Sequence, residues 1–406
     1  MTLDPVHFDG INSLVKRIRS DYDDSDQGQR ALELWEYLDP LFVDGERILY
    51  PMNSLKRNRV SIEDISLIED EYPTQNGLDS GTLNPHAFTN GLILDIGHAA
   101  MASVPSDLEL HRKRTVISAV HSSDSTVYLT DDWLSFDEES SKGRVVQTSS
   151  DLTRNQREAV HAYALYLSES QHLLDHIGRV DDLLFLDGPL YPMGIIRWIG
   201  RGEPMIEETK HVREILEKHT EGIDRLLEAE TPVVGFVKNM SSRRVVRQLR
   251  KKGVCPWSND ASFFKRVLSD IGGNEQLTFT NWFVSRFYDE NHDFSIDISE
   301  WVGGREHPDE DYYLTYMLIY DPRDRLIYKA EAPLGFTRDD ETREKLTRQV
   351  LKEVAIDGVP RAVQKADKLA RISRNERQSL IENLERTFRS RVDTTYNDRR
   401  WGDIEY

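Results

Sequence analysis

The sequence predicts an α/β fold in which a mixed sheet is flanked by helices. Apolar or β-branched runs of strand length alternate with longer stretches that have helical periodicity. The predicted strands cover residues 91–97, 114–120, 125–133, 182–190 and 231–238, and the predicted helices between and after them cover 153–177, 207–230 and 241–251. Three strands therefore come first, and two units of helix and strand follow them.

Each element has a local signal. GLILDIG (91–97) is a short apolar run that ends at an acid, and the turn-like HSSD separates the two β-branched runs after it. The long helix 153–177 has an apolar face formed by Val160, Ala164, Leu167, Leu174 and Ile177. A meander followed by right-handed βα crossovers is the RNase H-like arrangement, in which the first strand is central and the fourth and fifth are parallel to it.

The flanking regions are predicted to be accessory. Residues 1–85 hold two helical stretches, and the segment from Glu69 to Asn90 is rich in Gly, Pro, Asn and Ser, which favours a domain boundary. The main domain is expected at 86–375. Its remaining parts are an inserted lobe at 252–310, a hairpin at 311–334 and helices at 342–354 and 361–371, and a C-terminal helix and tail follow at 376–406.

Composition limits the class of protein. The sequence has no apolar run long enough for a membrane span and no secretory signal, and Cys255 is the single cysteine, so we expect a cytoplasmic protein without disulfides. The net charge of −19 argues against a nucleic-acid partner at first sight. However, only 15 of the 52 basic residues are Lys. Abundant acids with Arg in place of Lys favour a surface adapted to high salt, as in halophilic archaea.

Acids stand where strands end. Asp95 ends one apolar run and Asp187 ends another, and the carboxyl ends of parallel strands meet at one edge of a sheet. Glu158 lies in the first turns of the helix before Asp187 and is the third candidate. Several carboxylates together can hold one or two Mg²⁺ or Mn²⁺ ions. The alternatives are an ordinary Asp-Gly turn at Asp187 and a favourable helix-dipole position for Glu158.

The motifs resemble those of the NurA family of DNA nucleases. The segment LFLDGPLYP around Asp187 resembles the second acidic motif of the family. Four further segments follow the family order, namely LILDIG (92–97), REAV (157–160), PVVGFVKNMSSRRV (232–245), and the C-terminal pair IYKAEAPLGF (327–336) and DGVPRAVQKADKLARI (357–372). The resemblance covers roughly residues 86–375.

The resemblance implies a site and a reaction. Asp95, Glu158 and Asp187 would be catalytic acids that bind Mn²⁺ or Mg²⁺, and Lys238 would lie near a phosphate. The family commonly has His after Ala in its last helix, where this sequence has Asp367, and we read Asp367 as a substitute ligand. The family usually has Asp-Gly-Ser at its first motif, whereas Asp95 is followed by Ile and Gly.

The resemblance also implies partners. The expected activity is 5′-to-3′ exonuclease cleavage of DNA, with single-strand endonuclease cleavage as an addition, during double-strand break repair. A homodimer would act with a HerA-type hexameric ATPase, which must be a separate protein because no P-loop is present. The basic residues expected to guide the DNA backbone are Arg243, Arg244 and Arg247. The alternatives are a non-catalytic DNA-end-binding partner of that motor and a metal-free carboxylate-pair hydrolase acting on sugars.

Overall fold

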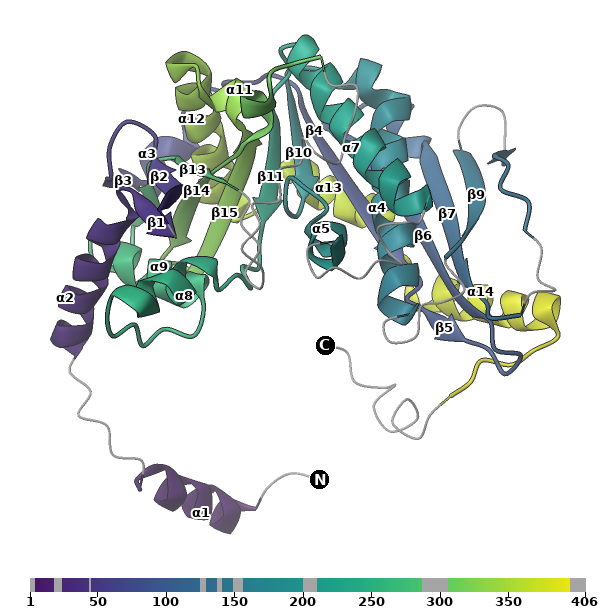
Figure 1. The fold of residues 1–406 in the computed structure, drawn as a ribbon, viewed down its shortest axis with the longest axis horizontal. Helices are drawn as coiled ribbons and strands as arrows, with labels where there is room; N and C mark the ends of the chain where they lie inside the picture. Colours follow the sequence, from purple (N-terminus) through teal and green to yellow (C-terminus); the bar gives the residue numbers. More distant parts are fainter. Residues whose placement is uncertain are drawn as a thin grey trace.

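The computed structural model describes residues 4–17, 24–43, 45–124, 129–136, 141–148, 156–199, 210–286 and 306–394 (Figure 1). Its strands are β1 Leu41–Val43, β2 Glu46–Pro51, β3 Arg57–Ser61, β4 Gln75–Thr82, β5 His86–Ala87, β6 Ile93–Val104, β7 Arg114–His121, β8 Leu134–Ser135, β9 Ser141–Gln147, β10 Leu183–Asp187, β11 Val233–Val237, β12 Gln276–Thr280, β13 Phe283–Ser285, β14 Leu314–Asp321 and β15 Leu326–Pro333. Its helices are α1 Pro5–Val15, α2 Asp24–Trp35, α3 Ile62–Ser66, α4 Gln156–His176, α5 Met193–Ile199, α7 Lys210–Glu228, α8 Arg244–Lys252, α9 Asp260–Ser269, α11 Leu334–Thr337, α12 Asp340–Asp357, α13 Arg361–Ala370 and α14 Arg374–Phe388.

The centre of the sheet has the predicted RNase H-like order. Its strands lie side by side as β7-β6-β4-β10-β11. β6 pairs antiparallel with both β4 and β7, whereas β10 pairs parallel with β4 on one side and with β11 on the other. The first, central strand of this arrangement is β4. The predicted first strand, 91–97, instead belongs to the second strand, β6, so the meander begins one strand earlier than the sequence indicated.

β4 is hard to recognise as a strand from its sequence, because that sequence is polar and rich in glycine. A Cβ atom on Gly77 would lie 2.2 Å from the carbonyl oxygen of Ala362, and one on Gly81 would lie 1.9 Å from that of Ala370. Glycine is therefore required where α13 packs directly on the strand. Because the same residues resemble a loop, the boundary expected near residue 85 falls between two paired strands of the sheet.

The rest of the chain extends this sheet. β15 and β14 continue it beyond β11, and β13 and β2 follow them, so the described part of the expected lobe at 252–310 pairs with the main sheet through β12 and β13. Of the expected strand at 125–133, residues 129–133 are not in a strand, and the others lie outside the described residues. The next neighbour of β7 is instead β9, which pairs with it in parallel.

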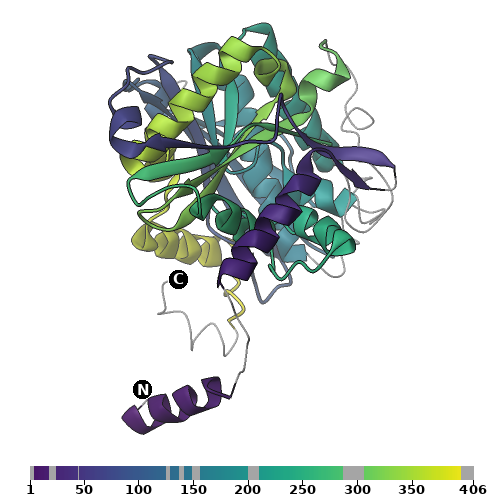
Figure 2. The ribbon, with the colours of Figure 1, turned by 90° about the vertical axis from the view of Figure 1, so that its left-hand side faces the viewer.

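Helices cover both faces of the central strands. α4 and α7 lie in front of the sheet and α13 lies behind it in the view of Figure 1. The main apolar core joins the sheet to α4, α7 and α12, and a second core holds residues of α2, α8 and α9. α1 buries none of its residues (Figure 2). Among the described helices, none is both long and apolar enough to cross a membrane.

Candidate metal centre

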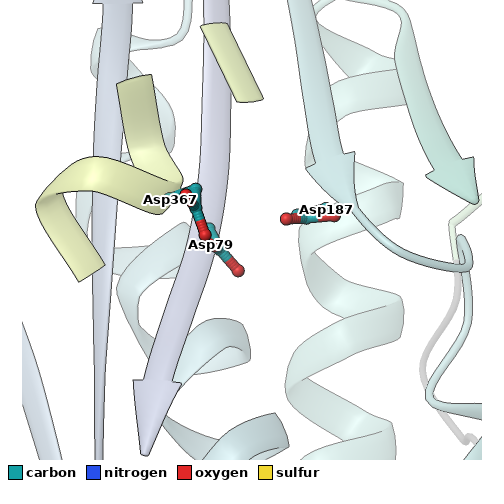
Figure 3. A group of neighbouring side chains, drawn as sticks. All are labelled: Asp79, Asp187 and Asp367. Atoms are coloured by element: carbon teal, nitrogen blue, oxygen red, sulfur yellow. The ribbon is translucent and has the colours of Figure 1, made fainter. Parts of the chain in front are cut away.

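Three aspartates converge at the edge of the sheet where β10 ends. Asp79 comes from β4, Asp187 is the last residue of β10, and Asp367 comes from α13 (Figure 3). One carboxylate oxygen of each lies within 4.8 Å of the others. The parallel register pairs Leu78 with Leu186, so Asp79 and Asp187 are the next residues along two neighbouring strands. The central strand thus places the first acid directly beside the second.

A fourth acid reaches the cluster from α4. The hydroxyl of Ser80 donates to Glu169 Oε1 at 2.6 Å, and Ser80 directly follows Asp79 on β4. Glu169, Asp79 and Asp187 line one cavity of about 300 Å³. Successive residues of a strand point to opposite faces of a sheet. The cavity therefore joins an acid from the α4 face to acids from the α13 face at the end of β10.

Three acids of this cluster, Asp79, Glu169 and Asp187, have pKa values above the ordinary range of a carboxyl group. Burial and the charge of Asp187 raise the pKa of Asp79 to about 7. Burial, followed by the charges of Asp79 and Asp187, raises the pKa of Glu169 to about 8, against the lowering effect of the Ser80 hydroxyl. Burial also raises the pKa of Asp187, although Lys238 lowers it. Carboxylates packed together disfavour each other's charge unless a cation is present.

The donor set fits a divalent cation of the hard type. All four side chains offer carboxylate oxygens, which Mg²⁺ and Mn²⁺ prefer, and the soft thiolate and imidazole ligands of other metals are not part of the triad. Lys238 already supplies one positive charge, with its Nζ 2.6 Å from Asp187 Oδ2. One lysine does not neutralise four acids. Burial first, and then the charges of neighbouring acids, raise the pKa of Asp79, Glu169 and Asp187.

Basic residues predicted from the sequence lie beyond this lysine. Arg243 and Arg244 stand at the start of α8, and Arg247 is in its first turn. Arg243 and Arg247 are exposed. Arg244 lines a neighbouring cavity of about 250 Å³, which shares Pro189 with the cavity of the acids. These arginines are therefore on the side of the acid cluster where the chain leaves β10 and β11.

Asp95 does not join the cluster. It lies five residues along β6 from Ala100, the residue that pairs with Asp79, which corresponds to about 16 Å at ~3.3 Å per residue. Its carboxylate is fully buried, and Oδ2 lies 2.9 Å from His161 Nδ1. The expected proximity of Asp95 and Asp187 is wrong because β6 is the second strand of the meander and runs opposite to β4.

Glu158 is also separated from the cluster. It is exposed in the first turn of α4, whereas Glu169 is three turns further along. α4 has 21 residues and precedes β10, which has five, so the two elements differ in length. From Asp187 back to the start of β10 is about 13 Å, which corresponds to roughly nine helical residues before the end of α4. Glu169 lies close to that position in α4, whereas Glu158 lies about three turns nearer the start of the helix.

Asp187 and Asp367 were predicted from the sequence, whereas Asp79 and Glu169 were missed. A signal for Asp79 was present, since Asp79-Ser80-Gly81 has the composition of the family's first motif, from which Asp95 departs. Glu169 could be identified only by comparing the length of α4 with that of β10. The miss of Asp79 follows from reading the glycine-rich strand β4 as a loop, and the miss of Glu169 follows from the unequal lengths of α4 and β10.

A family model and several solved structures are similar to this chain. The family model of the NurA domain matches residues 73–372, a range that begins just before β4. The NurA nuclease from Sulfolobus solfataricus is similar in structure, with 12% identity, a TM-score of 0.49 and coverage of 95% of this chain and 98% of that one. A structure of NurA with manganese has 10% identity and a TM-score of 0.47, with coverage of 89% of this chain and 97% of that one. A structure of NurA bound to dAMP and manganese has 10% identity and a TM-score of 0.41, with coverage of 79% of this chain and 89% of that one. No curated protein matches the chain.

Proposed function

Because the chain belongs to the NurA family, we propose that it is a metal-dependent nuclease that hydrolyses phosphodiester bonds of DNA. The observation that supports this most is the convergence of Asp79, Asp187 and Asp367 within 4.8 Å at the end of the central strands. The pKa values of Asp79 and Asp187 are raised, and acids with raised pKa values that converge from separate parts of the chain are typical of a functional site.

All four acids serve as ligands of the cation, three from one side of the sheet and one from the other. Asp79, Asp187 and Asp367 bind one or two Mn²⁺ or Mg²⁺ ions, with Asp367 in the place of the histidine that the family commonly has. Glu169, held by Ser80, completes the ligand set from the α4 side. When bound, such ions lower the pKa of a water and stabilise the oxygen that leaves phosphorus.

Basic residues orient the DNA. Lys238 is held by Asp187 and lies where it can turn to a phosphate oxygen as the substrate enters. Arg243, Arg244 and Arg247 bind the backbone further along. Contacts of this kind fix the position of the strand without reading its sequence, and at high salt their contribution is weakened, so that the metal contributes more of the binding.

The finer assignments rest on the family resemblance. In this proposal the protein is a cytoplasmic homodimer of a halophilic archaeon. It degrades DNA 5′ to 3′ at double-strand breaks, with single-strand endonuclease cleavage as a second activity, and a HerA-type hexameric ATPase supplies the strand. Duplexes labelled at the 5′ or the 3′ end, with and without such a motor, separate these properties.

Two matched pairs of variants test the site. Asp79→Asn is compared with Asp95→Asn, and Glu169→Gln with Glu158→Gln, with Mn²⁺-dependent DNA cleavage measured at high salt. We expect the first member of each pair to lose activity by roughly a hundredfold or more, as removal of groups that stabilise developing charge commonly does. The second members should retain activity if they fold. The reverse pattern would restore the sequence-based assignment.

DNA binding without turnover is the outcome that favours the non-catalytic alternative. In that case the parent protein binds DNA ends, Mn²⁺ produces no cleavage, and Asp367→His does not create activity. Cleavage that persists in a chelator contradicts the metal-dependent mechanism itself.

A further inference from the structure

The segment after Asp187 is held by residues that the proposed mechanism does not use. Gly188 has φ +124°, in the region that favours glycine, and Pro189 follows it. The next residue, Leu190, packs on the neighbouring strand. A Cβ atom on Gly235 of β11 would lie 2.4 Å from the Leu190 nitrogen, so the loop packs directly on the strand next to Asp187.

Both main-chain polar groups of Leu190 are bonded to ionisable side chains. The Leu190 N–H donates to Glu331 Oε2 at 2.8 Å. The Leu190 carbonyl accepts from His219 Nε2 at 2.6 Å, and a carbonyl can only accept, so His219 carries its proton on Nε2. A turn could satisfy these groups with water or backbone atoms. Here two distant elements, β15 and α7, meet at one residue.

Glu331 lies in β15, and the sheet holds its side chain against the Leu190 N–H. It is 4% exposed, it pairs across the strands with Gly235, and Lys329 Nζ donates to its other oxygen at 2.5 Å. The carboxylate thus has one cationic partner and one amide partner and no free oxygen. A buried carboxylate costs free energy unless it is paired in this way. Glu331 and Lys329 belong to the family-like segment 327–336, and neither is among the proposed ligands of the cation.

We infer that Glu331 and His219 are positioning residues, which fix Leu190 on both sides and so hold the Asp187 carboxylate in the cation site. Asp187 is the last residue of its strand, and only the two-residue turn of Gly188 and Pro189 separates it from Leu190. A shift of Leu190 is therefore passed to Asp187. The inference rests on the proposed function, because it assumes that Asp187 binds the cation.

Glu331→Gln is the principal test, because Glu331 does not line the cavity of the acids. The variant keeps the shape and removes the charge that both partners use. We expect the Kd for Mn²⁺, measured by titration calorimetry on the full chain, to rise about tenfold, as loss of residues that orient metal ligands commonly causes. The KM for DNA at saturating Mn²⁺ should stay near the parent value, and kcat should fall.

The matched control is Asp321→Asn. Asp321 is a buried carboxylate of the same hairpin, paired with Arg323, and it lies five residues along β14 from Tyr316, the cross-strand neighbour of Glu331. A purely structural effect of removing a buried carboxylate should therefore appear in both variants. The inference requires the Kd for Mn²⁺ to change in Glu331→Gln alone, while thermal unfolding of the metal-free proteins shows comparable losses in the two.

A second pair tests the other side of Leu190 and serves if Glu331→Gln fails to fold. His219→Gln retains an N–H donor at the position of Nε2, whereas His219→Leu does not. The leucine variant should weaken Mn²⁺ binding about tenfold and the glutamine variant should restore it. Folded Glu331→Gln and His219→Leu proteins that bind Mn²⁺ as tightly as the parent would overturn the inference.

Asp187→Asn separates this failure from failure of the proposed function. If Asp187→Asn loses Mn²⁺ binding while the Glu331 and His219 variants keep it, only the positioning role is wrong. If Asp187→Asn itself binds Mn²⁺ normally, the cation site has been placed at the wrong residues.

Discussion

The hydroxyl of Ser80 lies 2.6 Å from the carboxyl of Glu169, and this bond ties the central strand of the sheet to the long helix at the acid cluster. Ser80 points to the α4 face, whereas its neighbour Asp79 belongs to the cluster with Asp367 of α13. The dipeptide Asp79-Ser80 of β4 thus contacts acids from the helices on both faces of the sheet. The site can form only because β4 is the central strand, between these two layers of helices.

Ser80→Ala should move the pH dependence of cleavage to higher pH. The hydroxyl lowers the pKa of Glu169, which burial has raised to about 8, so its removal raises that pKa further. The carboxylate must be ionised to bind the cation, and the rising limb of the pH–rate profile therefore shifts to the alkaline side. The profile of kcat/KM at fixed Mn²⁺ measures this. An unshifted profile in a folded variant means that Glu169 does not bind the cation.

Mn²⁺ binding should strengthen as the pH rises from about 6 to 8. The pKa of Asp79 is about 7 and that of Glu169 about 8, so at pH 6 the cation must displace protons from both, and well above pH 8 from neither. Calorimetry in buffers of different ionisation enthalpy counts the protons released. We expect proton release at pH 6 that declines steadily as the pH rises past 8, and a pH-independent affinity would contradict the assignment of these acids as ligands.

The folded protein should lose stability as the pH falls below about 6.5. Burial lowers the pKa of His176 and of His219 to about 4, and it also lowers that of His172 well below its ordinary value. A folded-state pKa below the unfolded value of ~6.5 contributes stability that is present above pH ~6.5 and is lost as the pH falls toward 4. Chemical unfolding at pH 7 and pH 5 measures this loss, and His176→Gln should reduce it.

Much of the fold could be predicted from the sequence because most of its elements follow hydrophobic periodicity. The helix 153–177 and the strand ending at Asp187 became α4 and β10 with small changes at the ends. β4 could not be recognised in this way, since its side chains are selected by contact with α13 and by the acid cluster. Gly77 and Gly81 are required by a helix that is nearly three hundred residues away in sequence.

The site was half predictable for the same reason. Asp187 follows an apolar strand and Asp367 lies in a segment with a family motif, so local sequence identifies both. Asp79 lies within β4, whose sequence does not resemble that of a strand. Glu169 stands in the middle of a helix, where an acid is ordinarily a solvated residue, and only the lengths of α4 and β10 distinguish it from Glu158.

Glu169→Gln should abolish Mn²⁺ binding and yet stabilise the metal-free protein at alkaline pH. The pKa of Glu169 is raised from 4.5 to about 8, so ionised Glu169 destabilises the folded state. A raised folded-state pKa contributes stability that is present below the unfolded value and is lost as the pH rises through about 8. The amide is neutral at every pH and escapes this loss, for which about 5 kcal/mol is the upper limit at ~1.4 kcal/mol per pKa unit.

Chemical unfolding of the parent and Glu169→Gln proteins in a chelator, at pH 6 and pH 9, measures this effect. The stability of the parent should fall between the two values more than that of the variant, and Mn²⁺ should restore the parent alone. Glu158→Gln, on the exposed side of the same helix, should behave as the parent does. Equal pH dependence in all three proteins would mean that Glu169 is already paired without a cation, and the reason for a metal at this site would be lost.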